Sequence, residues 1–174
     1  MSAIPEIIDK PLSRAALAER FRQLCADPQF ANLPGKIELD VWGRILMSPA
    51  SNRHGIVQLE VGHRLRPLGG KALVEASVAT STGVLVADVA WASSEFMARR
   101  GTESPFTEAP EICVEIASPS NSLKELREKV AAYLDSGALE AWIVYPASKR
   151  IEFYGGTGSL AGTAFEIDLD GVFD

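Results

Sequence analysis

The sequence predicts a mixed α/β domain in which helices flank a central β-sheet, with a further helix and a β-hairpin at the N-terminal end. The length of 174 residues fits one domain, 1–174, with a hydrophobic core. Strand-like runs alternate with helical patterns, which is typical of this class. A strand at 111–118, a helix at 122–136 and a strand at 140–146 have the order of a right-handed crossover unit.

The N-terminal part predicts a helix followed by a hairpin. In residues 13–30, apolar residues recur at spacings of three or four, and Ser13 can cap the start of the helix. Residues 36–48, "KIELDVWGRILMS", alternate between apolar and polar side chains, and Gly43 interrupts them where a turn is expected. The charged side chains of this hairpin, Glu38 among them, should therefore share one face.

Residues 52–68 predict a helix with apolar side chains on two sides. One stripe begins at His54 and ends at Leu68, whereas Ile56 and Leu59 lie on the other side. We therefore expect this helix to be covered on two faces.

The remaining elements are mostly strands. They are expected at 71–80, 83–93, 111–118, 140–146 and 150–155, and in the C-terminal run "AFEIDLD". The helix at 122–136 has a natural stop in Gly137.

The composition excludes some classes of function. The net charge is −6 and the pI about 5.0, whereas proteins that bind nucleic acid through its phosphates usually carry a basic surface. The adjacent Arg99 and Arg100 are more simply interpreted as part of a solvated face. No apolar run approaches the roughly 18 residues of a membrane helix, and no secretion signal is visible, so we expect a cytoplasmic protein without a membrane partner. The acidic balance still allows a site that recruits Mg²⁺.

Two predicted central strands each carry one acidic residue among apolar neighbours: Asp88 in "GVLVADVAWAS" and Glu115 in "EICVEIAS". Two carboxylates brought together raise each other's pKa, and a divalent cation removes that conflict. Mg²⁺ prefers a few carboxylates, waters and phosphate oxygens. For either acid alone, a structural role is the better interpretation: Asp88 would bond backbone groups at a strand end, and Glu115 would pair with an arginine. For both acids, followed by a lysine-bearing helix, we favour a metal site.

Longer stretches resemble a known family. "VADVAWAS" and "PEICVEIASPSNSLKELREKVAAYLDSGALEAWIVYPASKRIEFYG" resemble the Uma-type restriction endonucleases of the PD-(D/E)XK nuclease superfamily, and "KIELDVWGRILMSPASNRHGIV" is similar to their hairpin with its glutamate and following histidine. The resemblance covers about residues 36–155. It implies a restriction-endonuclease-like fold and a metal-dependent endonuclease that hydrolyses phosphodiester bonds in DNA with Mg²⁺ or Mn²⁺.

The resemblance also implies roles for individual residues. Asp88 matches the motif aspartate and Glu115 the second acid, and both would hold the metal. The sequence departs from the pattern at Ala87, where the family has proline, and at Ala117, where the superfamily motif has lysine. In this family the lysine moves to the next helix, where Lys129 matches it.

Three of these assignments keep structural alternatives. Lys129 lies at the edge of the apolar stripe of its helix, so its amine could reach the sheet, or it could pair with Glu125 on a solvated face. Glu38 matches the family as an accessory residue but could merely face water. His54 matches as well, although a core or capping histidine is the better interpretation from its apolar stripe.

Two functions of other classes stay open. One is a nuclease fold retained as a non-catalytic binding or assembly module, which the acidic pI and Ala117 support and the three charged positions oppose. The other is a metal-independent structural domain with ordinary buried ion pairs. A nuclease that cuts both strands of DNA would be compatible with a homodimer, which no pattern in the sequence predicts.

Overall fold

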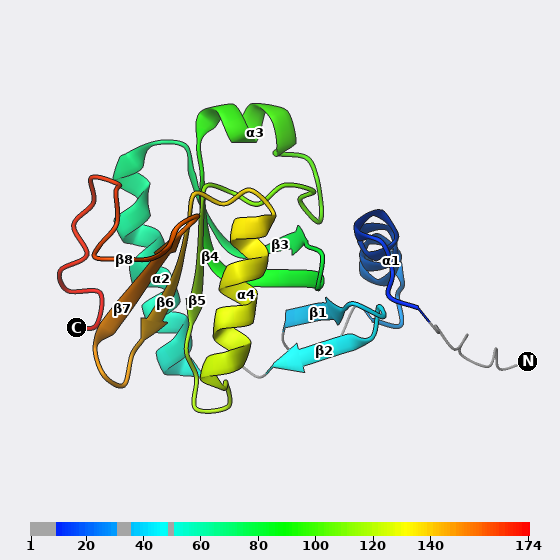
Figure 1. Cartoon of the computed structure of the whole chain (residues 1–174), viewed down its shortest axis with the longest axis horizontal. Helices are drawn as coiled ribbons and strands as arrows, with labels where there is room; N and C mark the ends of the chain where they lie inside the picture. Colours follow the sequence, from blue (N-terminus) through cyan, green and yellow to red (C-terminus); the bar gives the residue numbers. More distant parts are fainter. Residues whose placement is uncertain (1–9, 31–35, 49–50) are drawn as a thin grey trace, which may run out of the picture.

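The computed structural model describes residues 10–30, 36–48 and 51–174. These residues form a mixed eight-stranded sheet with helices on its faces (Figure 1), which confirms the predicted class. The helices are α1 (Arg14–Ala26), α2 (Asn52–Leu65), α3 (Ser94–Arg100) and α4 (Leu123–Asp135), with a 3₁₀ turn at Arg66–Leu68. The strands are β1 (Lys36–Asp40), β2 (Ile45–Ser48), β3 (Lys71–Ala79), β4 (Gly83–Ala92), β5 (Ile112–Ile116), β6 (Glu140–Tyr145), β7 (Arg150–Gly155) and β8 (Gly158–Leu160).

Strand β4 is the centre of the sheet, and every residue in it is buried. One side of β4 pairs with β3 along nearly its whole length. The other side pairs with two strands, β1 at residues 83–84 and β5 at residues 89–91. Between these two contacts, residues 85–88 have no strand partner on that side among the described residues. We call this interval the fork.

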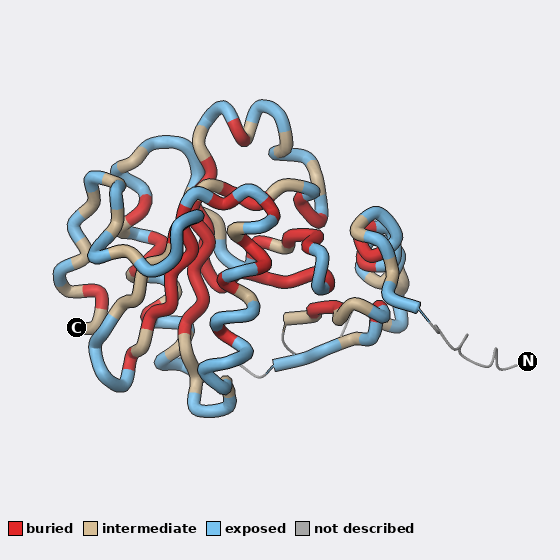
Figure 2. Tube along the Cα trace, in the orientation of Figure 1, coloured by how far each residue is buried: buried red, intermediate tan, exposed pale blue. Residues whose placement is uncertain are grey.

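The predicted crossover is present: β5 and β6 run parallel, and α4 connects them. Helix α4 packs Leu126, Val130 and Tyr133 against one face of the sheet. Helix α2 packs its buried valines and Leu65 against the other face, around Trp142. Figure 2 shows the buried residues concentrated in the central strands between these two helices. The site described below therefore lies in a rigid, well-packed frame.

Serine caps fix the starts of the helices. Ser13 accepts a hydrogen bond from the backbone N–H of Ala16, which confirms the predicted start of α1. Ser122 and Glu125 form a reciprocal capping box at the start of α4. Helix α3, which was not predicted, is short, is capped by Ser93 and buries a single large side chain, so its apolar periodicity is weak.

Two predictions about packing are wrong. Helix α2 is covered on one face only, because Ile56 and Leu59 are 57% and 67% exposed. The C-terminal run "AFEIDLD" is not a strand, and β7 pairs instead with the short strand β8. Its apolar residues pack beside the α2-side core, and the backbone N–H of Ala164 donates to the buried Glu140 carboxylate at 2.7 Å. The apolar residues of this alternating run are therefore packed against the core, although the run does not pair with a strand.

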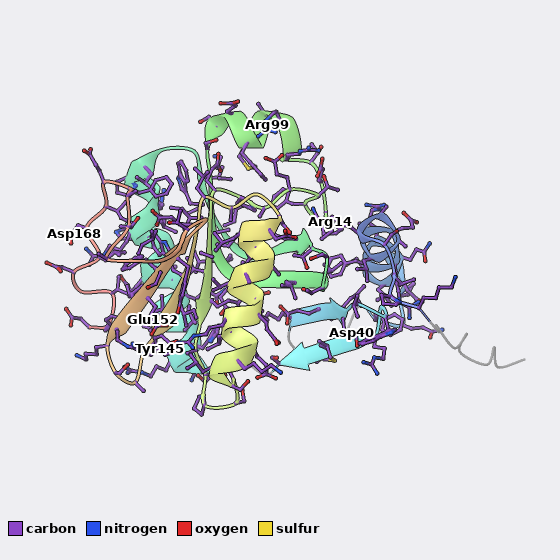
Figure 3. All side chains as sticks on the ribbon, in the orientation of Figure 1. Arg14, Asp40, Arg99, Tyr145, Glu152 and Asp168 are labelled. Atoms are coloured by element: carbon purple, nitrogen blue, oxygen red, sulfur yellow. The ribbon has the colours of Figure 1, made fainter. Side chains whose placement is uncertain are left out.

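Several arginines are neutralised by acidic partners at the periphery. Arg99 and Arg100 of α3 both pair with Glu108, at 3.1 and 3.3 Å. Arg14 lies 3.8 Å from Asp135. Figure 3 shows Arg99 on α3 at the edge of the molecule, and Arg14 between α1 and the rest of the molecule. These residues therefore do not supply an open basic surface. In the described ranges, no helix has the length and apolar character needed to cross a membrane.

Candidate active site

At the fork, side chains replace a neighbouring strand as partners of the β4 backbone. The N–H of Val86 donates to Glu38 Oε1 at 2.8 Å, and the carbonyl of Val86 accepts from Lys36 Nζ at 2.9 Å. The carbonyl of Asp88 accepts from Gln58 Nε2 at 2.8 Å. Because unpaired buried backbone groups are costly, these three bonds let β1 and β5 separate from β4.

A cavity of about 70 Å³ occupies the fork. Its lining consists of Lys36, Ser48, His54, Glu75, Asp88, Glu115, Ile116, Ser118, Asn121 and Lys129. His54 comes from α2 and Lys129 from α4, the helices that cover opposite faces of the sheet. Because the sheet is open at the fork, side chains from both faces reach the same cavity. The cavity thus collects six charged or titratable residues that the sequence spreads from position 36 to position 129.

Asp88 lies in the fork and is ionised. Its Oδ2 accepts a hydrogen bond from the backbone N–H of Ile116 at 2.7 Å. Its Oδ1 lies 2.7 Å from Lys36 Nζ and 3.3 Å from His54 Nε2. Burial by itself would raise the pKa of Asp88, but the hydrogen bond from His54 and the positive charge of Lys36 outweigh it and lower that pKa to about 2. The bond to Ile116 agrees with the alternative in which Asp88 only bonds backbone groups. The contacts with Lys36 and His54 are not part of that alternative.

Strand β5, which pairs with β4, carries Glu115 to the same cavity. The Oε1 atom of Glu115 accepts a hydrogen bond from the Tyr133 hydroxyl at 2.6 Å, and Lys129 Nζ lies 3.3 Å from its Oε2 atom. Burial raises the pKa of Glu115; the charge of Lys129 opposes that shift and the charge of Asp88 adds to it. The expected arginine partner is therefore wrong, since Glu115 pairs with a lysine and a tyrosine. A further cation in the cavity would favour the ionised form of Glu115.

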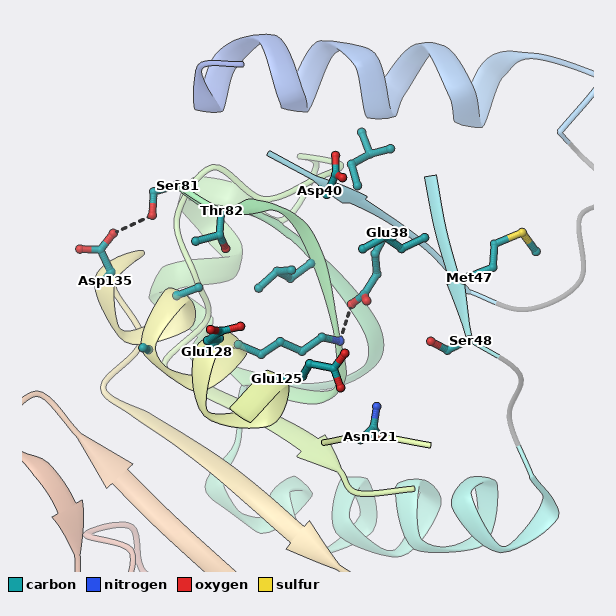
Figure 4. A pocket seen from close by; sticks show the side chains of 16 residues that line it. Glu38, Asp40, Met47, Ser48, Ser81, Thr82, Asn121, Glu125, Glu128 and Asp135 are labelled. Atoms are coloured by element: carbon teal, nitrogen blue, oxygen red, sulfur yellow. Dashed lines mark hydrogen bonds and ion pairs between the residues drawn. The ribbon is translucent and has the colours of Figure 1, made fainter. Parts of the chain in front are cut away.

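Lys129 reaches from α4 to the sheet. Its Nζ donates to Glu38 Oε1 at 2.7 Å, which Figure 4 marks with a dashed line, and also to Glu115. Burial alone would lower the pKa of Lys129, but the carboxylates of Glu115 and Glu38 raise it well above its ordinary value. The alternative pair with Glu125 is wrong, because the Glu125 carboxylate bonds Ser122 in the capping box. The contact confirms the predicted reach of the side chain, and its catalytic role stays a prediction.

The structure places both accessory residues, Glu38 and His54, at the fork. Glu38 is buried and bonds Val86 and Lys129, so it does not face water. His54 points its ring at Asp88 and its side chain is only 15% exposed, which agrees with a core histidine whose ring has a partner, whereas the cap of α2 is Ser51. Sequence reasoning missed Lys36, although the alternating hairpin pattern places it on the same face as Glu38.

A larger cleft of about 710 Å³ lies beside the fork, between the β1–β2 hairpin, the β3–β4 turn and α4 (Figure 4). Its wall carries the acidic residues Asp40, Glu125, Glu128 and Asp135, and Ser48, Asn121 and Lys129 line both this cleft and the smaller cavity. Acidic side chains repel phosphate groups. This cleft is therefore an unfavourable path for a DNA backbone.

The donor set of the fork fits a divalent cation in type. Asp88 and Glu115 provide two carboxylates on one cavity, and the carbonyl oxygen of Ile116 follows Glu115 directly in β5. Mg²⁺ takes few protein carboxylates and keeps positions for water and phosphate oxygens, which suits this set. In the described part of the chain, no three or more acidic, histidine or cysteine side chains are grouped so that they could hold a metal ion by themselves. Water or substrate would have to complete the coordination.

Comparison with known proteins agrees with this architecture. The family model Uma2, described as "Putative restriction endonuclease", matches residues 18–163. A solved structure described as a putative nuclease belonging to DUF820 from Anabaena variabilis ATCC 29413 has a TM-score of 0.59 and 20% sequence identity, over 72% of this chain and 76% of that one. At this identity the likeness concerns the fold alone. No curated protein matches the chain.

Proposed function

Because the chain belongs to the Uma2 family of nucleases, we propose that it is a metal-dependent endodeoxyribonuclease that hydrolyses phosphodiester bonds in DNA. The observation that carries the proposal is the cavity of the fork, in which Asp88, Glu115 and Lys129 come together. These are the residues that the PD-(D/E)XK pattern assigns to catalysis, with the lysine moved from the strand to the following helix.

In this proposal Asp88 and Glu115 hold Mg²⁺ or Mn²⁺, together with the carbonyl oxygen of Ile116. The bound cation supplies polarisation of the scissile phosphate and a lowered pKa for the attacking water. Asp88 is already ionised at neutral pH, which a metal ligand requires. Tyr133 acts as a positioning residue, because its hydroxyl fixes one oxygen of Glu115 at 2.6 Å.

Lys129 supplies a positive charge that does not depend on the metal. Its ammonium is held between Glu38 and Glu115, at the border of the cavity. From there it would orient the attacking water or stabilise the negative charge that develops on the phosphate in the transition state. Glu38 in turn positions Lys129, and His54 helps to hold Asp88.

The proposed partner is DNA, and the charges suggest how it binds. A net charge of −6 and the acidic wall of the larger cleft argue against strong non-specific attraction to phosphates. Affinity should therefore depend on contacts near the fork and on the bound cation. We further propose a cytoplasmic protein, and a homodimer if both strands are cut at one place.

The test is cleavage of supercoiled plasmid DNA with Mg²⁺ or Mn²⁺. Asp88→Asn, Glu115→Gln and Lys129→Met should each lower the rate by about two orders of magnitude or more, the usual loss when a group that stabilises the transition state is removed. The control is Lys124→Met on the same helix, whose side chain is 82% exposed and lies 3.7 Å from Glu128. Equal, mild losses in the lysine variants would remove Lys129 from the mechanism.

The rival function is a non-catalytic binding or assembly module, favoured by the acidic charge and by Ala117. It predicts that the wild type cleaves no DNA with either metal. A metal-independent structural domain predicts in addition that Mg²⁺ and Mn²⁺ leave the stability unchanged.

A further inference from the structure

Lys36 is a second lysine in the fork, and none of the steps proposed above uses it. Its Nζ is held at two points, 2.9 Å from the Val86 carbonyl oxygen and 2.7 Å from Asp88 Oδ1. The side chain is only 13% exposed. Val86 lies in buried β4, so its carbonyl anchors the ammonium against Asp88. This contact is therefore a fixed part of the site.

The charges of the fork are nearly balanced without a metal. Glu38, Asp88 and Glu115 supply three buried negative charges when ionised, and Lys36 and Lys129 supply two positive charges. Glu75 also lines the cavity, but it is exposed to water and is left out of this balance of buried charges. A divalent cation would turn a net charge of −1 into +1. Positive charges close together in a buried site repel each other strongly. The metal therefore meets a site whose negative charge is already largely neutralised.

Lys36 opposes the metal most directly of the two lysines. Both carboxylate oxygens of Asp88 have partners, and Oδ2 accepts a hydrogen bond from the backbone N–H of Ile116. Oδ1 is the atom that Lys36 contacts at 2.7 Å, with His54 at 3.3 Å. Lys129, by contrast, contacts Glu38 and Glu115. A cation at Asp88 must displace the Lys36 ammonium or bind beside it, and either way its affinity falls.

We propose that Lys36 is a built-in counter-ion of Asp88 that competes with the divalent cation, so that the protein without DNA binds metal weakly. The inference rests on the proposed function, because it assumes that Asp88 is a metal ligand. The negative charge of a phosphodiester group would offset the excess positive charge. Metal and DNA should then bind with positive coupling. Lys36 would thus limit metal loading to the complex with substrate.

The experiment measures Mn²⁺ binding to the metal-free full chain by isothermal titration calorimetry, without DNA. Lys36→Gln removes the charge but keeps an N–H donor for the Val86 carbonyl. It should lower the Kd for Mn²⁺ at least about tenfold, which corresponds to about 1.4 kcal/mol. Lys36→Arg keeps the charge and should bind Mn²⁺ about as weakly as the wild type. A purely structural role of Lys36 would give the opposite sign, since a damaged site binds metal less tightly.

The matched control is Arg44→Gln, which removes one positive charge from the same hairpin. Arg44 pairs with Asp40 and lies over the Trp42 ring, away from the acids of the fork. The Kd of Arg44→Gln for Mn²⁺ should equal that of the wild type. An equal gain in both glutamine variants would mean a general charge effect and would overturn the role of Lys36.

Other outcomes separate this inference from the proposed function. Saturable Mn²⁺ binding that is unchanged or weaker in Lys36→Gln overturns the inference and leaves the metal site standing. Absence of Mn²⁺ binding in both the wild type and Lys36→Gln contradicts the metal dependence itself. If Lys36→Gln does not fold, the inference is tested on the wild type by measuring how fast its lysines are acetylated with and without Mn²⁺. Saturating Mn²⁺ should raise the reactivity of Lys36 severalfold with Lys124 as reference, and unchanged reactivity overturns the inference.

Discussion

Replacing Lys129 by methionine should destabilise the protein strongly, apart from any effect on catalysis. Methionine keeps an apolar stem against the sheet but removes the ammonium that lies 2.7 Å from Glu38 and 3.3 Å from Glu115. Both acids are buried, at 5% and 3% exposure. From the sequence alone, a helix-edge lysine would contribute only tenths of a kcal/mol. The structure corrects that expectation.

The magnitude follows from the burial of this ion pair. Removing one partner of a buried pair typically costs about 3–5 kcal/mol, because the other charge is left without compensation. Here the lysine side chain is 19% exposed and serves two acids. Since a domain has about 5–15 kcal/mol of stability in total, the loss is a large fraction of it. For a chain of this length it corresponds to a fall in Tm of roughly 10 °C.

The loss should depend on pH. The pKa of Glu115 is already raised by burial in the folded protein, and removing Lys129 raises it further, because the positive charge that opposes this shift disappears. A group whose folded pKa exceeds its unfolded pKa loses stability as pH rises between the two values. In the variant, protonation of Glu115 removes the buried negative charge that has lost its lysine partner. Its deficit relative to the wild type should therefore be smaller near pH 5 than near pH 8.

The assay is urea unfolding in the presence of EDTA, followed by tryptophan fluorescence at both pH values. Lys124→Met serves as control, because its exposed pair with Glu128 is worth only about 0.3–0.5 kcal/mol. A Lys129→Met variant within 1 kcal/mol of Lys124→Met, at the same pH, would refute the reasoning. It would mean that the acids of the fork do not need this cation.

Three further predictions follow from the same site and its frame. Mn²⁺ should raise the Tm of the wild type through binding to the folded state, and Asp88→Asn should abolish that rise; a rise that persists places the metal elsewhere. Since the pKa of Asp88 is lowered from 3.8 to about 2, the wild type should lose about 2 kcal/mol as the pH falls between these values, and Asp88→Asn should not show this component in acid unfolding. Gly83→Ala would place a Cβ 1.9 Å from the Leu39 carbonyl oxygen at a φ of +149°, so β1 must shift from β4, and hydrogen exchange in β1 should accelerate sharply while that in β6 stays slow.

The central strands and their acids could be predicted from the sequence because their signals are local. Asp88 and Glu115 are single charges in runs that are otherwise apolar, and such runs become buried strands. The pairing of β4 with β5 then follows from their order in a sheet with a crossover. The apolar stripe of α4 likewise predicts which face packs on the sheet.

The partners of the charged residues could not be predicted in the same way. Helical spacing gives the direction of Lys129 but not what lies there, and its contact Glu38 is 91 positions away. Lys36 carried no local sign of burial, because its partners belong to a strand about 50 positions later. The fork itself arises from where β1 ends its pairing with β4, which is a property of strand register. Alternation in a sequence does not specify register between distant segments.

The fork also determines when the site can form during folding. Strand β5, α4 and β6 follow one another along the chain, so their contacts close short loops and can form early. The contacts of Lys36 with Asp88 and of Glu38 with Lys129 span 52 and 91 positions, and must wait until the hairpin docks on β4. In a newly released chain, Asp88 and Glu115 can therefore take their places in β4 and β5 before the hairpin docks and completes their surroundings. The complete arrangement belongs only to the fully folded molecule, so unfinished chains lack it.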